Sequence, residues 1–274
     1  MSQSYIPLRH RAETEPQHRA DIIRAGQLVF EKGWVAANAG NITVRLGENR
    51  ILATPTGVSK GMLSPEDLII TDLEGNRVHG DRDVTSEMGM HLTIYQERPD
   101  IHAVVHAHPP TATGFAVAHR ALNEGILPEV IVGLGAVPLA EYGEPGTPAL
   151  GDSLRPFLER YEAILLTNHG AVTFGETLQS AYFRMETVEH TARITLAAEL
   201  LGGVKNLPRA EIEKLFAARG RYGITAKNLF EPGLPLAAED LDRIKDKELD
   251  EEKFTLTRRQ LISIIEEVLK LARS

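Results

Sequence analysis

Three histidines stand at the ends of apolar segments, where their spacing suits a metal ion. His106 and His108 lie two residues apart at the end of the apolar run 101–107. Side chains alternate along a strand, so both imidazoles would point the same way and could reach one ion. His169 follows a second apolar run, 163–167, and three neutral imidazoles leave an open position on zinc for a substrate oxygen. Histidine pairs of this kind also occur as surface or packing residues, so both interpretations stay open here.

Glu87 adds a carboxylate at the start of a predicted helix, 86–97, for which Thr85 or Ser86 is the expected N-cap. A glutamate in a first turn is a common feature of helix starts, and the spacing alone favours that role. The alternative is a catalytic base that removes a proton next to a metal-polarised carbonyl group.

Three short turns offer hydroxyl, amide or free backbone N–H groups that suit a phosphate group. They are Gly40-Asn41, Thr56-Gly57 and Thr85-Ser86. Each is an unspecific turn sequence when taken alone. Lys60 could add positive charge, although an exposed, solvated lysine is the simpler expectation. His91 lies on the predicted helix 86–97 beside polar neighbours, and an ordinary helix position is expected for it.

The composition argues against several classes of protein. The chain has 274 residues, a net charge of -8 and no cysteine. The acidic balance argues against general binding to nucleic acid, and the missing thiols leave histidine and carboxylate as zinc ligands. Residues 1–19 lack the apolar core of a secretory signal, and no apolar run reaches the length of a membrane span. We therefore expect a cytoplasmic protein without membrane or nucleic-acid partners.

The elements that would position these residues alternate between helix and strand. Periodicity and turn residues predict helices at 16–33, 86–97, 110–120, 147–160, 177–201 and 208–219, and strands at 42–46, 50–54, 67–72, 101–107, 163–167 and 171–174. This order predicts an α/β layered domain with a mixed or antiparallel sheet. A change in composition after position 223 predicts a domain at 1–223, a linker at 224–254 and a separate amphipathic helix at 255–274.

Taken in order, these residues resemble the class II aldolase/adducin family. The resemblance covers about 16–223 and rests on an ordered set of motifs: Gly40-Asn41-Ile42-Thr43-Val44-Arg45, Thr54-Pro55-Thr56-Gly57, Thr85-Ser86-Glu87, His106-Ala107-His108, Asn168-His169-Gly170 and Tyr222-Gly223. It implies a three-layer α/β fold in which a central, mainly antiparallel sheet carries helices on both faces. It also implies a homotetramer with one Zn²⁺ per subunit.

The resemblance further implies roles for single residues. His106, His108 and His169 match the family's zinc ligands, and Glu87 matches its catalytic acid/base, which can also touch the metal. The family's phosphate-binding segments match Gly40, Asn41, Thr56, Gly57, Thr85 and Ser86, and a tyrosine that closes over the site matches Tyr222. The family's aldolases carry an acid tyrosine in the segment that corresponds to 126–135. This chain has none there, and Glu129 or Tyr142 could take its place.

The motifs are most similar to those of L-fuculose-1-phosphate aldolases. The resemblance therefore implies cleavage of L-fuculose 1-phosphate, or a related ketose 1-phosphate, to dihydroxyacetone phosphate and L-lactaldehyde. An L-ribulose-5-phosphate 4-epimerase is one alternative, but it usually carries aspartate at position 87 and a His-Thr-His pair, where this chain has Glu87 and His-Ala-His. A methylthioribulose-1-phosphate dehydratase shares the three histidines. The non-enzyme alternative is an adducin-like binding module, which lacks them.

The helix predicted at 255–274 extends past the usual end of the family. Leu261, Ile265, Val268 and Leu269 fall on one face of it at about 100° per residue. It could pack on its own domain or on a neighbouring subunit. The other interpretation is a docking helix similar to the encapsulation peptides that bind a bacterial microcompartment shell protein, which would place the chain inside such a compartment.

Overall fold

The apolar runs of the sequence form one eight-stranded sheet. The computed structural model describes residues 14–222, and the predicted linker 224–254 and helix 255–274 lie outside that range. The strands follow the order β4-β3-β2-β1-β5-β8-β7-β6, and of the described pairs only β6 and β7 run parallel. A mainly antiparallel sheet is thus confirmed. The strands are β1 (Asn41–Gly47), β2 (Arg50–Ala53), β3 (Ile69–Thr71), β4 (Arg77–His79), β5 (Ala103–Ala107), β6 (Leu139–Ala140), β7 (Ala163–Leu166) and β8 (Gly170–Gly175).

Helices account for most of the remaining described chain. The α-helices are α1 (Glu15–Glu31), α2 (Met88–Glu97), α3 (Pro110–Val117), α4 (Pro128–Gly133), α5 (Pro148–Asp152), α6 (Arg155–Leu158), α7 (Leu178–Leu200) and α8 (Arg209–Ala218). Three short 3-10 helices are η1 (Lys60–Met62), η2 (Pro65–Asp67) and η3 (Arg219–Tyr222). Over residues 14–222, no helix has both the length and the apolar character needed to cross a membrane.

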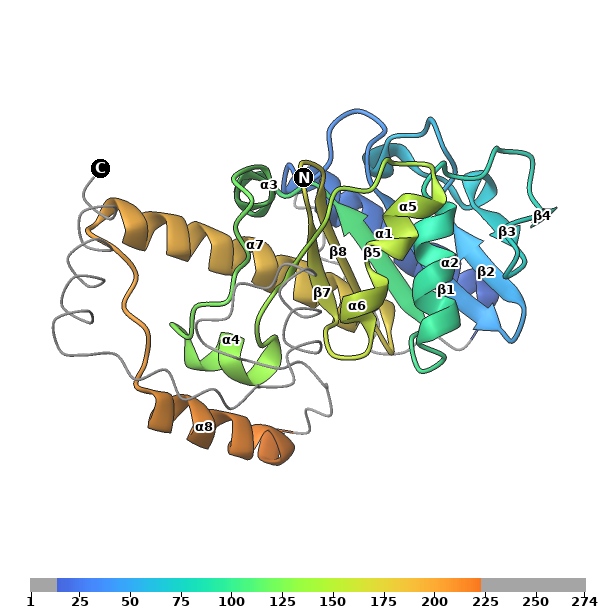
Figure 1. Ribbon diagram of the computed structural model, residues 1–274. Coiled ribbons are helices and arrows are strands. Elements are labelled where there is room, and N and C mark those ends of the chain that lie inside the picture. The colour runs from blue at the N-terminus through green and yellow to red at the C-terminus, as the bar shows by residue number, and fades with distance from the viewer. Residues whose placement is uncertain (1–13, 223–274) are drawn as a thin grey trace, which may run out of the picture. The chain divides into compact units, whose positions relative to one another are not determined.

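The helices cover both faces of the sheet. α1 and α7 pack on one face, where Ile42, Val44 and Val105 join a continuous apolar core. α2 covers the other face, with α5 and α6 beside it (Figure 1). Each buried Val, Leu or Ile side chain contributes roughly 1.5–3 kcal/mol to folding, so a sheet buried on both faces makes a stable platform. The predicted three-layer arrangement is confirmed.

Two predicted elements are present with different bounds, for local reasons. The single helix expected at 147–160 is broken into α5 and α6, because the Pro156 ring lacks a backbone donor and clashes with the preceding turn. The strand expected at 67–72 starts late because Asp67 accepts hydrogen bonds from the backbone and the hydroxyl of Ser64 in a capping box. The elements α4, β4 and β6 are too short for periodicity to predict.

A buried glutamate holds the start of α3 against α7. The first turn of a helix leaves backbone N–H groups without partners inside the helix. Here the Glu189 carboxylate, from the middle of α7, accepts hydrogen bonds from the N–H groups of Thr111 and Ala112 at 2.9 to 3.3 Å. It also accepts one from Arg193 at 2.8 Å. Because α3 begins two residues after His108, this contact holds the segment that follows that histidine.

We expect Glu189→Ala to lower the free energy of unfolding by about 3 kcal/mol, because the change leaves buried N–H groups without an acceptor. Urea unfolding measures the loss. Glu186→Ala is the matched control on the same helix: the ion pair of Glu186 with Lys32 is 43% and 38% exposed, so its loss should stay below about 1 kcal/mol. Equal losses in the two variants would contradict the capping role.

Candidate metal centre

The metal-binding candidates meet at one end of the sheet. β1 pairs with β5 so that Asn41 lies opposite His106, and β8 pairs with the other edge of β5. His106 is therefore held in a strand with a neighbour on each side, and it is buried. The backbone N–H of His108 donates to the carbonyl of Trp34 at 2.8 Å. This bond fixes His108 just beyond the end of β5.

His169 reaches the same place from the turn between β7 and β8. Asn168 adopts a φ of 56° in this turn, and asparagine tolerates that left-handed conformation better than most residues. Gly170, the first residue of β8, allows β8 to approach β5 closely. A Cβ at this position would lie 2.6 Å from both the Ala107 carbonyl oxygen and the His108 ring. A side chain there would therefore push β8 away from His106 and His108.

The ring nitrogens of the three histidines face one point. One candidate ligand atom from each of His106, His108 and His169 lies within 4.8 Å of the others. Nδ1 of His106 lies 3.0 Å from the carbonyl oxygen of Ala171. Because a carbonyl only accepts, Nδ1 carries the hydrogen and Nε2 presents its lone pair to the cluster. Metal-binding histidines are commonly oriented by a second contact of this kind.

Burial keeps two of these imidazoles neutral. It lowers the pKa of His106 to about 3, against the opposing effect of Glu87. Burial also lowers the pKa of His108. A neutral imidazole has a free lone pair, so both side chains are ready to act as metal ligands at neutral pH.

Glu87 brings a carboxylate to the same point. It occupies the N-cap position of α2, yet its side chain makes no capping hydrogen bond. The expected N-caps Thr85 and Ser86 are therefore wrong, and so is the helix-start role that spacing favours for Glu87. Its Oε1 instead lies 3.0 Å from His169 Nε2, and its Oε2 lies 3.3 Å from His106 Nε2.

The ionisation of Glu87 is set by its neighbours. Burial alone raises the pKa of Glu87, but the contacts with His106 and His169 and a hydrogen bond from Asn41 Nδ2 at 2.6 Å outweigh it. The pKa therefore lies well below its usual range, and the group is ionised at neutral pH. A buried, ionised carboxylate can accept a proton from a group placed beside it.

The donor set fits a zinc ion. Imidazole nitrogen and carboxylate oxygen are ligands that zinc prefers, and the chain has no cysteine to supply thiolate. Glu87 Oε1 is buried and lies 3.0 Å from His169 Nε2, so one cation could contact both atoms. His106, His108 and His169 could thus hold the ion, with Glu87 as a fourth or transient ligand.

The turn segments predicted for phosphate lie next to one another. The N–H of Thr56 donates to the Asp83 carbonyl at 3.1 Å, and Pro55 forms an isolated bridge with Val84. These contacts bring Thr56-Gly57 beside Thr85-Ser86. Their role in binding phosphate stays a prediction.

Gly40 joins the third predicted segment to the histidine cluster. Its φ is +73°, and a Cβ at this position would lie 2.9 Å from the carbonyl oxygen of His106. Glycine is therefore needed here for both conformation and space. The next residue, Asn41, directs its amide towards Glu87.

Lys60 is buried, so the expectation of an exposed lysine is wrong. The residue is 1% exposed, and its Nζ donates to the carbonyls of Val58 at 2.7 Å and Asn38 at 3.0 Å. Asn38 precedes Gly40-Asn41, and Val58 follows Thr56-Gly57. The ammonium group therefore ties two of the predicted phosphate segments together. Burial lowers its pKa to about 8.

Three other predicted residues come from elements that do not form the cluster. Glu129 is exposed on α4, and Tyr142 is 61% exposed. Tyr222 ends η3, the last described element. Their catalytic roles stay predictions.

His91 is a site residue that the sequence interpretation missed. It is fully buried on α2 and contacts Asn41 and Thr43 of β1. The spacing of four residues between Glu87 and His91 is the sequence feature that could have indicated this role. Residues four apart share one face of a helix, and here that face packs against the sheet.

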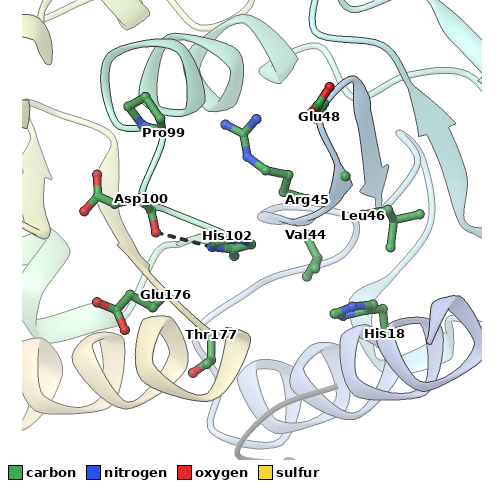
Figure 2. Close-up of a pocket in the computed structure, with 11 residues that line it drawn as sticks. His18, Val44, Arg45, Leu46, Glu48, Pro99, Asp100, His102, Glu176 and Thr177 are labelled. Carbon is green, nitrogen blue, oxygen red and sulfur yellow. Dashed lines mark hydrogen bonds between the residues drawn. The ribbon is translucent and has the colours of Figure 1, made fainter. Parts of the chain in front are cut away.

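A separate hollow lies at the opposite end of β1 and β5. Its volume is about 830 Å³, and its lining includes Arg45, Asp100, His102 and Glu176 (Figure 2). The Arg45 guanidinium is already engaged, because it donates to the carbonyl of Tyr95 at 2.8 Å. None of the clustered histidines lines this hollow. It is therefore distinct from the metal centre.

The fold and the site together define a three-layer α/β protein with a histidine and carboxylate centre at the end of its sheet. A family model, the Class II Aldolase and Adducin N-terminal domain, matches residues 20–196. The chain therefore belongs to the class II aldolase and adducin family.

Its relatives include two kinds of lyase. The chain is 33% identical to a 3-oxo-tetronate 4-phosphate decarboxylase of Pectobacterium atrosepticum over 198 residues, 71% of this chain and 90% of the relative. It is 35% identical to an L-fuculose phosphate aldolase of Methanococcus maripaludis over 174 residues, 64% of this chain and 93% of the relative. A solved L-fuculose 1-phosphate aldolase superposes with a TM-score of 0.69 at 30% identity, covering 78% of this chain and 99% of that one.

The geometry of the cluster predicts one zinc ion per chain. His169→Ala should weaken zinc affinity by more than about 10-fold, because it removes one of the three imidazole ligands. Loss of a residue that only hydrogen-bonds to a metal ligand already weakens metal affinity by about 10-fold or more. Zinc content after dialysis against buffered zinc solutions measures the change. His79→Ala is the control, since His79 is exposed on β4. Unchanged zinc affinity in His169→Ala would count against this site.

The buried ammonium predicts a pH effect on stability. In the folded protein Lys60 loses its proton near pH 8, whereas an unfolded lysine keeps it to about pH 10.4. Between these values the unfolded state binds more protons, so stability should rise with pH relative to Lys60→Met. The full gain is about 3 kcal/mol. Urea unfolding of both proteins from pH 7 to pH 10 tests this, and parallel pH curves would refute it.

Proposed function

We propose that this protein is a zinc-dependent aldolase that cleaves L-fuculose 1-phosphate, or a related ketose 1-phosphate, to dihydroxyacetone phosphate and L-lactaldehyde or a similar aldehyde. One observation carries the proposal: the buried, ionised Glu87 contacts two of three clustered histidines. A proton-transfer group beside a polarised ketone is what breaking an adjacent carbon–carbon bond requires.

The chain's own residues would divide the work. A zinc ion bound by His106, His108 and His169 would act as a Lewis acid towards the ketone oxygen. Glu87, ionised at rest, would first take up a proton and then pass it to the third carbon once the bond of that carbon to the fourth carbon breaks. The proton lost from the hydroxyl of the fourth carbon balances this gain.

The phosphate group would be held beside the same site. The adjacent turns Thr56-Gly57 and Thr85-Ser86 and the neighbouring Gly40-Asn41 offer hydroxyl and backbone N–H donors. Lys60 adds a buried positive charge behind two of these turns. Binding of the phosphate would orient the ketone towards Glu87. Holding the reacting groups in this geometry would increase the reaction rate.

A second candidate reaction is decarboxylation of a 3-oxo-tetronate 4-phosphate. Segment 126–135 contains no tyrosine, and Glu129 on α4 is exposed, so the described structure offers no evident group for the aldehyde-side hydroxyl. Loss of carbon dioxide from a 3-oxo acid needs no such group. The electron pair of the broken bond would pass towards the ketone. The carbon that carried the carboxylate would then take a proton, supplied by solvent through Glu87, to give dihydroxyacetone phosphate.

Product analysis with both substrates tests the proposal. The aldolase proposal expects dihydroxyacetone phosphate and lactaldehyde from L-fuculose 1-phosphate, abolished by a chelator and restored by zinc. Carbon dioxide from 3-oxo-tetronate 4-phosphate, without cleavage of the ketose, would replace the aldolase by the decarboxylase. Turnover that survives complete zinc removal would refute the metal role.

Glu87→Gln should lower kcat by about 10²- to 10⁴-fold on whichever substrate is active, because the amide cannot transfer the proton. Glu129→Gln is the informative companion. If Glu129 serves the aldehyde side, it should slow ketose cleavage and leave proton exchange of dihydroxyacetone phosphate unchanged. Steady-state kinetics and exchange into deuterated water measure the two effects, and full activity of Glu87→Gln would contradict the proposed role.

We also propose a homotetramer and a shell-docking role for 255–274, both motivated by the resemblance and by the helical periodicity of that segment. Sedimentation of the full chain tests the first. For the second, 250–274 fused to a fluorescent protein should form foci when co-expressed with shell proteins. Diffuse fluorescence would refute docking.

A further inference from the structure

A line of buried polar groups runs from Glu87 along the interface between α2 and β1. Asn41, His91, Thr43 and Tyr95 form it, and they are 4%, 0%, 0% and 1% exposed. Unpaired polar groups in such a position would be costly. Glu87, His91 and Tyr95 recur every four residues along α2, so one helix face presents all three to β1.

Each link of this line is within hydrogen-bond distance. Asn41 Nδ2 lies 2.6 Å from Glu87 Oε2, and Asn41 Oδ1 lies 2.5 Å from His91 Nε2. His91 Nδ1 lies 2.7 Å from the Thr43 hydroxyl, which lies 2.9 Å from the Tyr95 hydroxyl. The chain of contacts is therefore continuous from the carboxylate to the phenol.

The Asn41 amide determines the direction of the bonds on both of its sides. Its Nδ2 faces Glu87 and its Oδ1 faces His91, and an amide nitrogen only donates whereas an amide oxygen only accepts. His91 must then carry its hydrogen on Nε2. Burial lowers the pKa of His91 to about 4, so the ring is neutral and its Nδ1 can only accept.

The remaining hydroxyls follow from the same argument. Thr43 must donate to His91 Nδ1, and its oxygen must accept from Tyr95. Burial raises the pKa of Tyr95, so the phenol keeps its hydrogen for Thr43. All four side chains therefore donate in the direction of Glu87, and bonds aligned in this way strengthen one another.

We propose that His91 is a positioning residue for Glu87: it holds the Asn41 amide as a donor to the carboxylate, and Thr43 and Tyr95 hold His91 in the tautomer that this requires. The inference rests on the proposed function, because it concerns the group that transfers the proton. Without His91, the Asn41 amide could turn its oxygen towards Glu87 and repel it.

Proton exchange tests this role separately from cleavage. Each zinc-loaded variant is mixed with dihydroxyacetone phosphate in deuterated water, and loss of the carbon-bound proton is followed by NMR. His91→Leu should slow exchange about 10- to 100-fold, the range for residues that orient a metal-site group. His91→Gln, which can present a donor and an acceptor in the same order, should recover much of the rate. Thr43→Val should slow exchange by a smaller factor than His91→Leu.

Matched controls separate positioning from packing. Thr173→Val removes a hydroxyl that is equally buried but donates to the carbonyl of Ala181 and does not join this line. It should leave the exchange rate unchanged. The effects should appear in kcat, with zinc content and the KM for dihydroxyacetone phosphate nearly constant. His91→Leu or Thr43→Val exchanging at the wild-type rate would overturn the proposal, as would His91→Gln behaving like His91→Leu.

A second measurement needs no turnover. Nitrogen NMR of the imidazoles, with His91→Gln used to assign the signal, reports which ring nitrogen carries hydrogen. We expect Nε2–H in the wild type and a mixture of tautomers in Thr43→Val. Hydrogen on Nδ1 of His91 in the wild type would overturn the proposal, whether or not the protein catalyses either proposed reaction. The opposite case is a wild-type protein that shows Nε2–H but does not exchange the proton of dihydroxyacetone phosphate. That result would count against the proposed function alone.

Discussion

A carboxylate removed from water must find compensating donors or charges, and this requirement organises one end of the sheet. Glu87 is 8% exposed, and its partners are Asn41 of β1, His106 of β5 and His169 of the β7–β8 turn. Each partner comes from a different part of the chain. The carboxylate is therefore satisfied only when β1, β5, the β7–β8 turn and α2 have assembled. The packing that stabilises the sheet thus also sets the proton affinity of the site.

The scaffold achieves this by close backbone approach and by a second buried charge. Gly170 and Gly40 allow β8 and the start of β1 to lie against the strand that carries His106. Lys60 then ties the turns before β1 and after β2 through two carbonyl groups. A buried ammonium is costly, so its presence indicates that holding these turns in place outweighs the loss of stability. Rigid turns next to a rigid carboxylate are what an oriented phosphorylated substrate requires.

The described residues provide the groups for one part of the proposed reaction and leave the groups for the other part unassembled. The groups that would generate or protonate dihydroxyacetone phosphate are assembled within the described residues, around Glu87 and the three histidines. The groups that would meet the departing fragment are not: Glu129 and Tyr142 are exposed. Relatives named as aldolase and as decarboxylase fit this division, because the two reactions share the first part and differ only in the fragment that leaves.

The sequence by itself determined the layered α/β class, most of the strands and helices, and the identity of the three histidines, since apolar periodicity, turn residues and spacing of two along a strand are local properties. It also pointed to Glu87, but the local pattern favoured a helix start. Only the tertiary structure decided that Glu87 faces the histidines, that Lys60 is buried and that His91 lies behind Asn41. The reason is physical, because burial and hydrogen-bond direction depend on what packs against a residue. Lys60 binds backbone carbonyl groups, and His91 packs against a strand that is distant in the sequence. Neither kind of partner leaves a local pattern in the sequence.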